Sequence, residues 1–519
     1  PVPSRRMSTT QAGWVPGDLT EELVRTSVWT EDLVQRAGIP IVDVPFVAVG
    51  GGMGSFVTVN LLRIAGVPVE QIKVLTDSDA PWQRYQYLTR ASQIPVHERI
   101  RSDSASIPDN FWGFPSLAWR EARQDKTLAP LWNVLVEPIF TDYWTPKAGT
   151  IFEGMAKEAQ RMRWFEMAAK GQVRMVRKRA AGGYFTILTP PEGVTPTKRI
   201  AYRSQFVHLA VGYPGLQFLD DLEEYRQTYG DVLRVVNAYE PHEHVYDELI
   251  RRPGTVVIRG AGVVASRVLQ RLCDDRERNG AQTTIIHLFR TYIDGPHGHS
   301  IFWRRKGAHG WAYQGFNYPK SAWGGQLWKK MRTLEGAERS QVYDWISGTN
   351  TPARKSWKRQ LAQGRREGWY RTQVGSVESV VPSPDGSMVV TRMRDKKSNA
   401  ILEVPANAVI DCTGLEADIT QHRVYADLME HSGAGRNIKN RLDVERSFEV
   451  RGTRSGAGRM YASGSMTLGG YFPGVDTFLG LQLAAVDIVD DLAAAGFGKR
   501  IGVGRSVSQW WKRMQGRQI

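Results

Sequence analysis

The sequence predicts an α/β protein with two parallel sheets, and three observations lead to this fold class. Near residue 50 a short apolar run is followed by a glycine-rich turn and a segment with helical periodicity, and the same order recurs near residue 260. Continuous apolar runs of this length are typical of strands buried inside parallel sheets. With 519 residues the chain is also too long for a single hydrophobic core. We therefore expect two domains of similar construction.

The first glycine-rich turn follows the apolar run Phe46–Val49. Gly50, Gly52 and Ser55 occupy the positions of a G-x-G-x-x-G pattern, with serine in third place and a further glycine at Gly54. A bare backbone here lets a pyrophosphate approach the N-terminus of the next helix, whose free N–H groups and dipole favour anions. The turn therefore predicts a Rossmann-like dinucleotide site. A second apolar run ends at Asp77, which is a candidate for binding the ribose hydroxyls.

The second glycine-rich turn follows the apolar run 255–259. The three positions of the pattern, and the residue after them, are filled by Gly260, Gly262, Ala265 and Ser266. The next predicted strand, 283–289, ends on Arg290, where an acidic residue would select NAD. An arginine can instead pair with the 2′-phosphate of NADP, although Arg290 could also be a solvated loop charge.

Later apolar runs predict how the chain passes between the two domains. Two of them end on Gly212 and Gly414, and strands of this kind carry the chain across the domain boundary in flavoproteins with two dinucleotide sites. A third run ends on Gly464, before a final amphipathic helix. The predicted layout is an FAD-binding domain that is discontinuous, with an NAD(P)H-binding domain inserted into it. The predicted parts are 40–235 for the first part of the FAD domain, 236–400 for the NAD(P)H domain with an insert, 401–500 for the return to the FAD domain, and 1–39 and 501–519 for flanking arms.

Three short motifs carry a family resemblance: the Phe316–Pro319 turn, the Gly348–Asn350 segment and the Pro473–Gly480 segment. With the two glycine turns, they make the chain similar to flavin-dependent monooxygenases with two dinucleotide-binding domains, and most similar to the branch that hydroxylates amine nitrogens. The resemblance implies FAD at the first turn, NADPH at the second, and O₂ and a small molecule as the other reactants. A homo-oligomer is expected from the family alone.

The resemblance also implies roles for single residues. It places Asn317 and Asn350 near the substrate or nicotinamide, as the candidate catalytic residues. The candidate flavin contacts are Trp82, Arg84, Asp476 and Thr477. Asp476 could instead be the N-cap of the last helix.

Composition excludes several other classes of protein. The two cysteines, Cys273 and Cys412, form no CxxC pair, so a disulfide reductase is excluded. The net charge of +15 is spread along the chain without a nucleic-acid-binding module, so no nucleic-acid partner is expected. No carboxylate or cysteine accompanies the His297/His299 pair, and no metal is predicted. No apolar run of 18 residues is present, and low cysteine usage favours a cytoplasmic protein.

Two other activities remain open on the same scaffold. A flavoprotein reductase or dehydrogenase dependent on NAD(P)H would pass electrons to a separate acceptor without activating oxygen. A single-component flavin halogenase would oxidise halide instead of an amine. The sequence does not identify the substrate.

Overall fold

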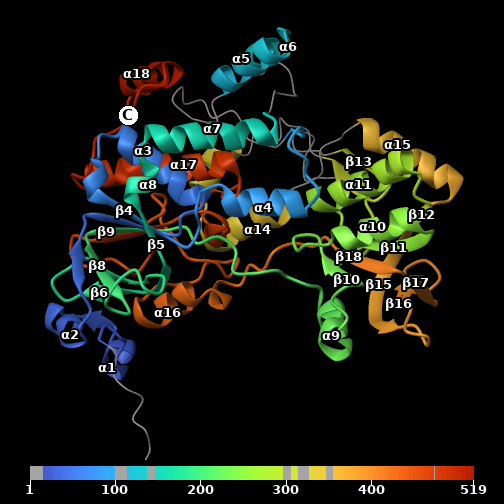
Figure 1. Ribbon diagram of the computed structural model, residues 1–519, viewed down its shortest axis with the longest axis horizontal. Helices are drawn as coiled ribbons and strands as arrows, with labels where there is room; N and C mark the ends of the chain where they lie inside the picture. Colours follow the sequence, from blue (N-terminus) through green and yellow to red (C-terminus); the bar gives the residue numbers. More distant parts are fainter. Residues whose placement is uncertain are drawn as a thin grey trace, which may run out of the picture.

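The computed structural model describes residues 16–99, 114–136, 146–295, 306–313, 326–346, 355–472 and 474–519. Figure 1 shows two α/β units side by side, the first formed by the blue and red ends of the chain and the second by its green and orange middle. Asn317 and Asn350 lie outside the described residues.

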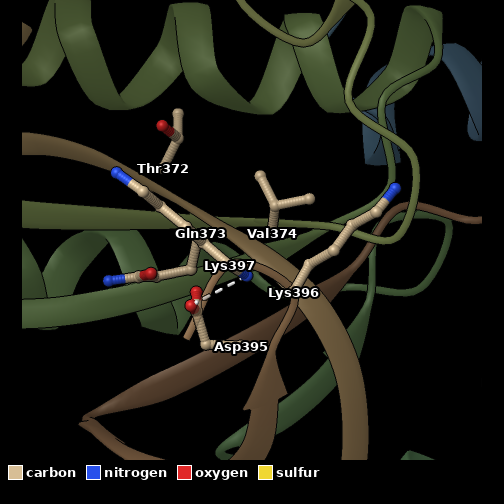
Figure 2. A pocket seen from close by; sticks show the side chains of 6 residues that line it. All are labelled: Thr372, Gln373, Val374, Asp395, Lys396 and Lys397. Atoms are coloured by element: carbon tan, nitrogen blue, oxygen red, sulfur yellow. Dashed lines mark hydrogen bonds between the residues drawn. The ribbon is translucent and has the colours of Figure 1, made fainter. Parts of the chain in front are cut away.

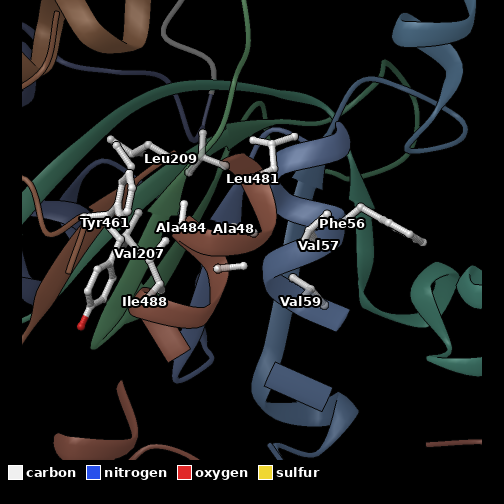
Figure 3. Close-up of a cluster of buried hydrophobic side chains, with 14 of the residues drawn as sticks. Ala48, Phe56, Val57, Val59, Val207, Leu209, Tyr461, Leu481, Ala484 and Ile488 are labelled. Atoms are coloured by element: carbon white, nitrogen blue, oxygen red, sulfur yellow. The ribbon is translucent and has the colours of Figure 1, made fainter. Parts of the chain in front are cut away.

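The first unit is centred on a parallel five-stranded sheet. Its central strand, Phe46–Val49, is apolar and buried along its whole length, as expected for a strand covered on both faces. Helices α3 (Met53–Ile64) and α17 (Phe478–Ala494) pack together against it, and side chains such as Val57 and Ile488 fill the space between them (Figure 3). In spatial order the strands are β19 (Arg459–Ala462), β9 (Phe206–Leu209), β3 (Phe46–Val49), β4 (Ile72–Thr76) and β5 (Ala168–Lys170).

A second five-stranded sheet belongs to the same unit and includes the N-terminal segment that was predicted as a flanking arm. Trp29 on its edge strand is completely buried, and the guanidinium of Arg177 forms an ion pair with Asp427 of α16 (Arg423–His431). The N-terminal segment is therefore integrated into the first unit from residue 16 onward. In order the strands are β1 (Val28–Trp29), β6 (Gln172–Arg179), β7 (Tyr184–Thr189), β8 (Ile200–Ser204) and β2 (Ile41–Asp43), preceded or linked by α1 (Glu21–Arg25) and α2 (Glu31–Arg36).

The second unit has a seven-stranded sheet whose first five strands are parallel. Val256 and Ile258 point into the core on one face and Val257 into the core on the other, so helices cover both faces. The helices are α9 (Asp220–Tyr229), α10 (Glu243–Arg251), α11 (Val263–Asn279) and α15 (Lys355–Glu367). The strands are β10 (Val235–Asn237), β18 (Ala408–Asp411), β11 (Gly254–Arg259), β12 (Thr283–Phe289), β15 (Tyr370–Pro382), β16 (Val389–Asp395) and β17 (Ile401–Ala406).

The second sheet extends beyond the predicted boundary at residue 400. β17 pairs with β16, and β18 lies between β10 and β11. Both strands therefore complete the second sheet before the chain returns to the first unit. The described helices of the predicted insert, α13 (Gln326–Met331) and α14 (Gly336–Ile346), have side chains in the core of the first unit. On this basis we propose a boundary near residue 412, with the insert returning to the first unit.

The outer face of the first unit carries a further layer of helices, which Figure 1 shows along its upper edge. α7 is the innermost of them and is held to α3 by a buried polar cluster. Glu158 of α7 accepts hydrogen bonds from Arg161 at 2.7 Å and from the side chain of Asn60 at 2.7 Å. The helices of this layer and its surroundings are α4 (Gln83–Ala91), α5 (Phe114–Gln124), α6 (Ala129–Val136), α7 (Ala148–Arg161), α8 (Trp164–Met167) and α18 (Val503–Met514).

The buried cluster makes a testable contribution to stability. Burial alone would raise the pKa of Glu158, but hydrogen bonds and charge from Arg161 hold that pKa below its usual value. Glu158→Gln leaves the buried guanidinium of Arg161 without a carboxylate, and we expect the free energy of unfolding to fall by about 3 kcal/mol in urea titrations at neutral pH. Because the pKa of Glu158 is lowered in the folded state, this difference should shrink as the pH falls through that pKa. Glu166→Gln, which opens an exposed pair with Arg163, is the control and should change little.

Candidate functional site

The first turn has the geometry that its glycines predict. Gly50 has φ +92°, and a Cβ at this position would lie 2.5 Å from the carbonyl oxygen of Ala210 on the neighbouring strand. Gly52 is the N-cap residue of α3 and has no side chain with which to cap the helix. Apart from its chain neighbours and its own helix, nothing lies within 4 Å of a Cβ built on Gly52. The N-terminus of α3 is therefore not covered by a capping side chain, which is what the approach of an anion to its N–H groups requires.

The second turn repeats this geometry in the second unit. Gly260 has φ +106°, and its Cβ would lie 2.9 Å from the carbonyl oxygen of Cys412. Gly262 is the N-cap of α11, again without a side-chain cap and with nothing within 4 Å of its Cβ position. In each unit, the helix that follows the glycine-rich turn thus begins at a glycine and has no side-chain cap.

Residues in the third position of each pattern serve packing. Ser55 and Ala265 are completely buried, and the Ser266 hydroxyl donates to the carbonyl of Val263 at 2.7 Å. A Cβ on Gly54 would lie 3.1 Å from the hydroxyl of Ser463, so α3 approaches β19 closely at this point. These residues allow each helix to lie against its sheet, and their side chains are not directed at the open space.

The polar ends of the neighbouring strands lie beside each turn. In the first unit, the side chain of Thr76 contacts Gly51, and the exposed Asp77 follows it directly. In the second unit, His287 of β12 is buried, and its Nε2 lies 2.6 Å from the carbonyl oxygen of Gly260. Burial lowers the pKa of His287 to about 4, so the neutral imidazole supports the turn at physiological pH. Sequence reasoning missed this histidine because its position within an apolar strand resembles ordinary core.

A polar pocket of about 350 Å³ lies beside the end of β12. Phe289 is the register partner of Val374, which lines this pocket, and the exposed Arg290 comes next along the chain. Lys396 and Lys397 line the same pocket from the loop after β16, and Figure 2 shows their side chains extending in opposite directions. The lining residues are Thr372, Gln373, Val374, Asp395, Lys396 and Lys397.

The one carboxylate of this pocket is occupied by its own loop. Asp395 accepts hydrogen bonds from the backbone N–H groups of Ser398 at 2.7 Å and Lys397 at 3.1 Å, and these bonds lower its pKa. The positive charge of Lys397 also helps to lower the pKa of Asp395, whereas the ammonium group of Lys396 forms no ion pair among the described residues. The pocket therefore presents positive charge that the protein itself does not neutralise. In the sequence these residues are only a pair of lysines in a hairpin. Their position beside β12 is set by the tertiary structure.

Two crossing segments join the units. Gly212 and Gly414 begin them, and Leu216 pairs with Leu415 as an isolated bridge between the two segments. The carboxylate of Asp411 accepts a hydrogen bond from the N–H of Leu219 at 2.8 Å, which ties one segment to the strand that begins the other. A second connection comes from Arg267 of α11, which forms an ion pair with Glu98 at 2.8 Å.

The remaining predicted residues lie around these segments. Thr477 is the N-cap of α17 and accepts from the N–H of Gly480 at 3.0 Å, so the capping role considered for Asp476 belongs to Thr477. Asp476 instead accepts from the hydroxyl of Tyr213 at 3.3 Å, and Arg84 donates to the carbonyl of Tyr213 at 3.4 Å. Trp82 is half-buried against the core of the first unit, and Gly464 leads from β19 into the loop before α17.

Three tyrosines gather where the two units meet, and sequence reasoning did not identify them. Burial and the nearby carboxylate of Asp476 raise the pKa of Tyr213, and burial raises that of Tyr85. Burial, with the charges of Cys412 and Asp476, raises the pKa of Tyr239 to about 12. All three keep their phenolic protons at neutral pH and can donate hydrogen bonds. Tyr85 and Tyr213 come from the first unit and Tyr239 from the second, so only the folded chain brings them together.

The fold and the two matched turns define a protein with two Rossmann-like domains, as predicted. No protein-family model matches the sequence, and no curated protein matches it. Solved structures do. An ornithine N-hydroxylase from Kutzneria sp. 744, in a form with reduced FAD, NADP⁺ and L-ornithine, is similar with a TM-score of 0.62 and 11% identity over 88% of this chain and 100% of that chain.

Two further solved structures are similar over nearly their whole length. One is an ornithine hydroxylase from Pseudomonas aeruginosa, with a TM-score of 0.59 and 14% identity over 88% of this chain and 100% of that chain. The other is an FAD-bound cadaverine monooxygenase of desferrioxamine biosynthesis from Erwinia amylovora, with a TM-score of 0.60 and 11% identity over 89% of this chain and 96% of that chain. At these identities the similarity establishes the fold, and it confirms the predicted α/β class with two Rossmann-like domains.

Two other features bound the kind of site that is present. Within the described ranges, no helix combines the length and apolarity needed to cross a bilayer. In the same ranges, no three histidine, cysteine or carboxylate side chains gather in a way that could hold a metal ion.

The two glycines of the first turn should respond differently to substitution. In Gly52→Ala the new methyl group enters open space, so we expect the free energy of unfolding of the cofactor-free protein to change by about 1 kcal/mol or less. The methyl group would occupy the approach to the helix N-terminus, and FAD affinity should fall by at least about tenfold. Flavin absorbance of the purified protein and thermal unfolding measure the two effects.

Gly50→Ala is the matched comparison. It places a side chain at positive φ and against a carbonyl oxygen, and it should destabilise the fold by about 3 kcal/mol or more. Equal losses of stability in both variants would contradict the assignment of Gly52 to the ligand and Gly50 to the backbone.

Proposed function

We propose that the protein is an FAD-dependent monooxygenase that uses NADPH and O₂ to hydroxylate the nitrogen of a small amine. The observation that carries this proposal is the pair of matched turns, one in each unit, each followed by a helix that begins at a glycine and has no side-chain cap. The structurally similar proteins include an ornithine N-hydroxylase and a cadaverine monooxygenase. Their substrates carry primary amines, and this supports the choice of a small amine.

The residues of the first unit suit FAD. Gly50 and Gly52 would let the pyrophosphate reach the N-terminus of α3, and Asp77 would accept hydrogen bonds from the ribose hydroxyls. Arg84, Asp476 and the helix N-terminus capped by Thr477 lie where the chain crosses between units and would contact the flavin. FAD, once reduced by NADPH, supplies the electrons and the activation of O₂.

The second unit suits NADPH. Gly260 and Gly262 would hold the pyrophosphate at the N-terminus of α11. Arg290 and Lys396 flank Val374 from two sides, since Arg290 follows the register partner of Val374 and the N–H of Lys396 donates to the Val374 carbonyl at 2.8 Å. We propose that these two cations bind the 2′-phosphate, which distinguishes NADPH from NADH.

At the reacting centre, the protein's own residues would position the substrate and the cofactors and would exclude water. The phenols of Tyr85, Tyr213 and Tyr239 can donate hydrogen bonds where the two units meet, while the surrounding aromatic side chains keep the region dry. By resemblance, Asn317 and Asn350 contact the substrate or the nicotinamide. We therefore assign them as substrate-positioning residues to be tested by substitution.

The purified protein tests the proposal directly. It should carry bound flavin, and NADPH should reduce that flavin faster than NADH does under anaerobic conditions. In air, NADPH oxidation and O₂ uptake should produce a hydroxylamine from L-ornithine, L-lysine or cadaverine. A colourless protein that takes up no FAD would refute the proposal. Rapid transfer of electrons to an added dye, with no hydroxylated product from any amine, would favour a reductase.

The assignment of the 2′-phosphate has its own test. Arg290→Ala and Lys396→Ala should each weaken binding of 2′,5′-ADP by about tenfold in calorimetry and leave binding of 5′-AMP unchanged, because the two ligands differ at the 2′-phosphate. Arg392→Ala is the matched control on the same sheet, since Arg392 already pairs with Glu403 at 2.9 Å. If both ligands lose affinity equally, Arg290 and Lys396 do not read the 2′-phosphate.

A further inference from the structure

Helix α18 packs on the protein with its polar face inward. Ser506 and Gln509 are its buried residues, and Gln509 accepts a hydrogen bond from Arg161 of α7 at 3.4 Å. Arg505 donates to the carbonyl of Ile64 at 3.0 Å, and Arg513 lies 3.7 Å from the carboxylate of Glu158. Polar contacts therefore hold the helix in place, in contrast to the apolar contacts that usually seat an amphipathic surface helix.

The apolar side chains of α18 point to solvent. Val503, Val507 and Trp511 are 81%, 49% and 57% exposed, and Met514 is also exposed. These four residues recur at intervals of three or four and so form one stripe along the helix, which we call the outer stripe. An isolated exposed apolar residue needs no explanation, but a continuous stripe on a helix anchored by its polar face does.

A second group of exposed apolar residues lies on the same side of the molecule. Figure 1 shows α18 and α5–α6 along the same edge, both outside α7. α5 also rests on α7, because Leu117 lies over Gly154. Trp119, Leu128 and Trp132 of this region are exposed. Two separate segments that pack on α7 thus both turn large apolar side chains outward.

The charge around the outer stripe indicates what covers it. Residues 492–519 contain six basic residues and no acidic one, and of the six Arg505 and Arg513 make the inward contacts described above. A second copy of this chain would bring two such segments together, and their like charges would repel. An anionic lipid surface is complementary to them: tryptophan and aliphatic side chains enter the headgroup region while lysine and arginine meet the lipid phosphates. Twelve residues of helix span only about 18 Å, so α18 would lie along such a surface rather than cross it.

We propose that α18, through the outer stripe and the basic residues around it, binds the surface of membranes that contain anionic phospholipids. The tryptophans of α5–α6 lie on the same side and would add a second point of contact. This binding is independent of the proposed redox function, since α18 contacts Ile64 at the C-terminal end of α3, whereas the first glycine turn is at the N-terminal end of that helix. The catalytic units would then stay intact while the molecule is held at a lipid surface.

Co-sedimentation of the full-length, flavin-loaded protein with vesicles tests this inference. We expect binding to vesicles of phosphatidylcholine mixed with phosphatidylglycerol, little binding to pure phosphatidylcholine, and a decrease with added salt. The double substitution Val507→Ser with Trp511→Ser should weaken binding by about tenfold or more, because two apolar side chains no longer enter the lipid. NADPH oxidation should be unchanged in this variant.

The matched control is Val194→Ser, which removes an equally exposed apolar side chain from a loop elsewhere in the first unit. It should bind the mixed vesicles as the parent protein does. No binding to the mixed vesicles at low salt would overturn the proposal. A concentration-dependent dimer that the double substitution abolishes, in a protein that does not bind vesicles, would identify a second copy as the partner and would also overturn it.

Discussion

The close approach of one glycine backbone to the carbonyl of a neighbouring strand is the contact on which the rest of this structure depends. Gly50 meets Ala210 in the first unit and Gly260 meets Cys412 in the second. In both, the absence of a Cβ allows the strand to turn sharply, so the next helix begins directly at the edge of the sheet. The second glycine of each turn then leaves the helix N-terminus uncovered. Without the first contact there would be no open, polarised helix end for a phosphate to reach.

The carbonyls of these contacts also lie at the start of the two crossing segments. Ala210 and Cys412 each lie two residues before the glycine that begins a crossing segment, Gly212 and Gly414 respectively. The same backbone atoms that shape each turn therefore position the connection between the units. Because the two segments pair with each other at Leu216 and Leu415, the two turns are linked through paired backbone segments. This explains how residues from both units can share one site.

Positive charge in this protein is largely neutralised by local pairing, and the exceptions are informative. Arg177, Arg226 and Arg259 each lie against a carboxylate. Lys396 of the pocket beside β12 has no such partner among the described residues, because Asp395 is occupied by its own loop. The segment after residue 492 contains six basic residues and no acidic one, and within it Arg513 lies against Glu158 of α7. The net charge of +15 thus includes two local concentrations, one suited to a nucleotide phosphate and one to a lipid surface.

Local sequence was sufficient to predict both glycine turns, because G-x-G-x-x-G after an apolar run has one low-energy arrangement in which strand, turn and helix pack together. It also placed Arg290 at the end of its strand. The boundary that we propose near residue 412, and the packing of α13 and α14 in the core of the first unit, could not be predicted from local sequence, because they depend on which strand edge and which core remain uncovered. Local sequence also could not predict the grouping of the three tyrosines, the position of the lysines beside β12 or the exposure of the outer stripe of α18. Each of these features depends on contacts between segments that are far apart in sequence. Such contacts form only when the whole chain folds, so a local sequence pattern does not predict them.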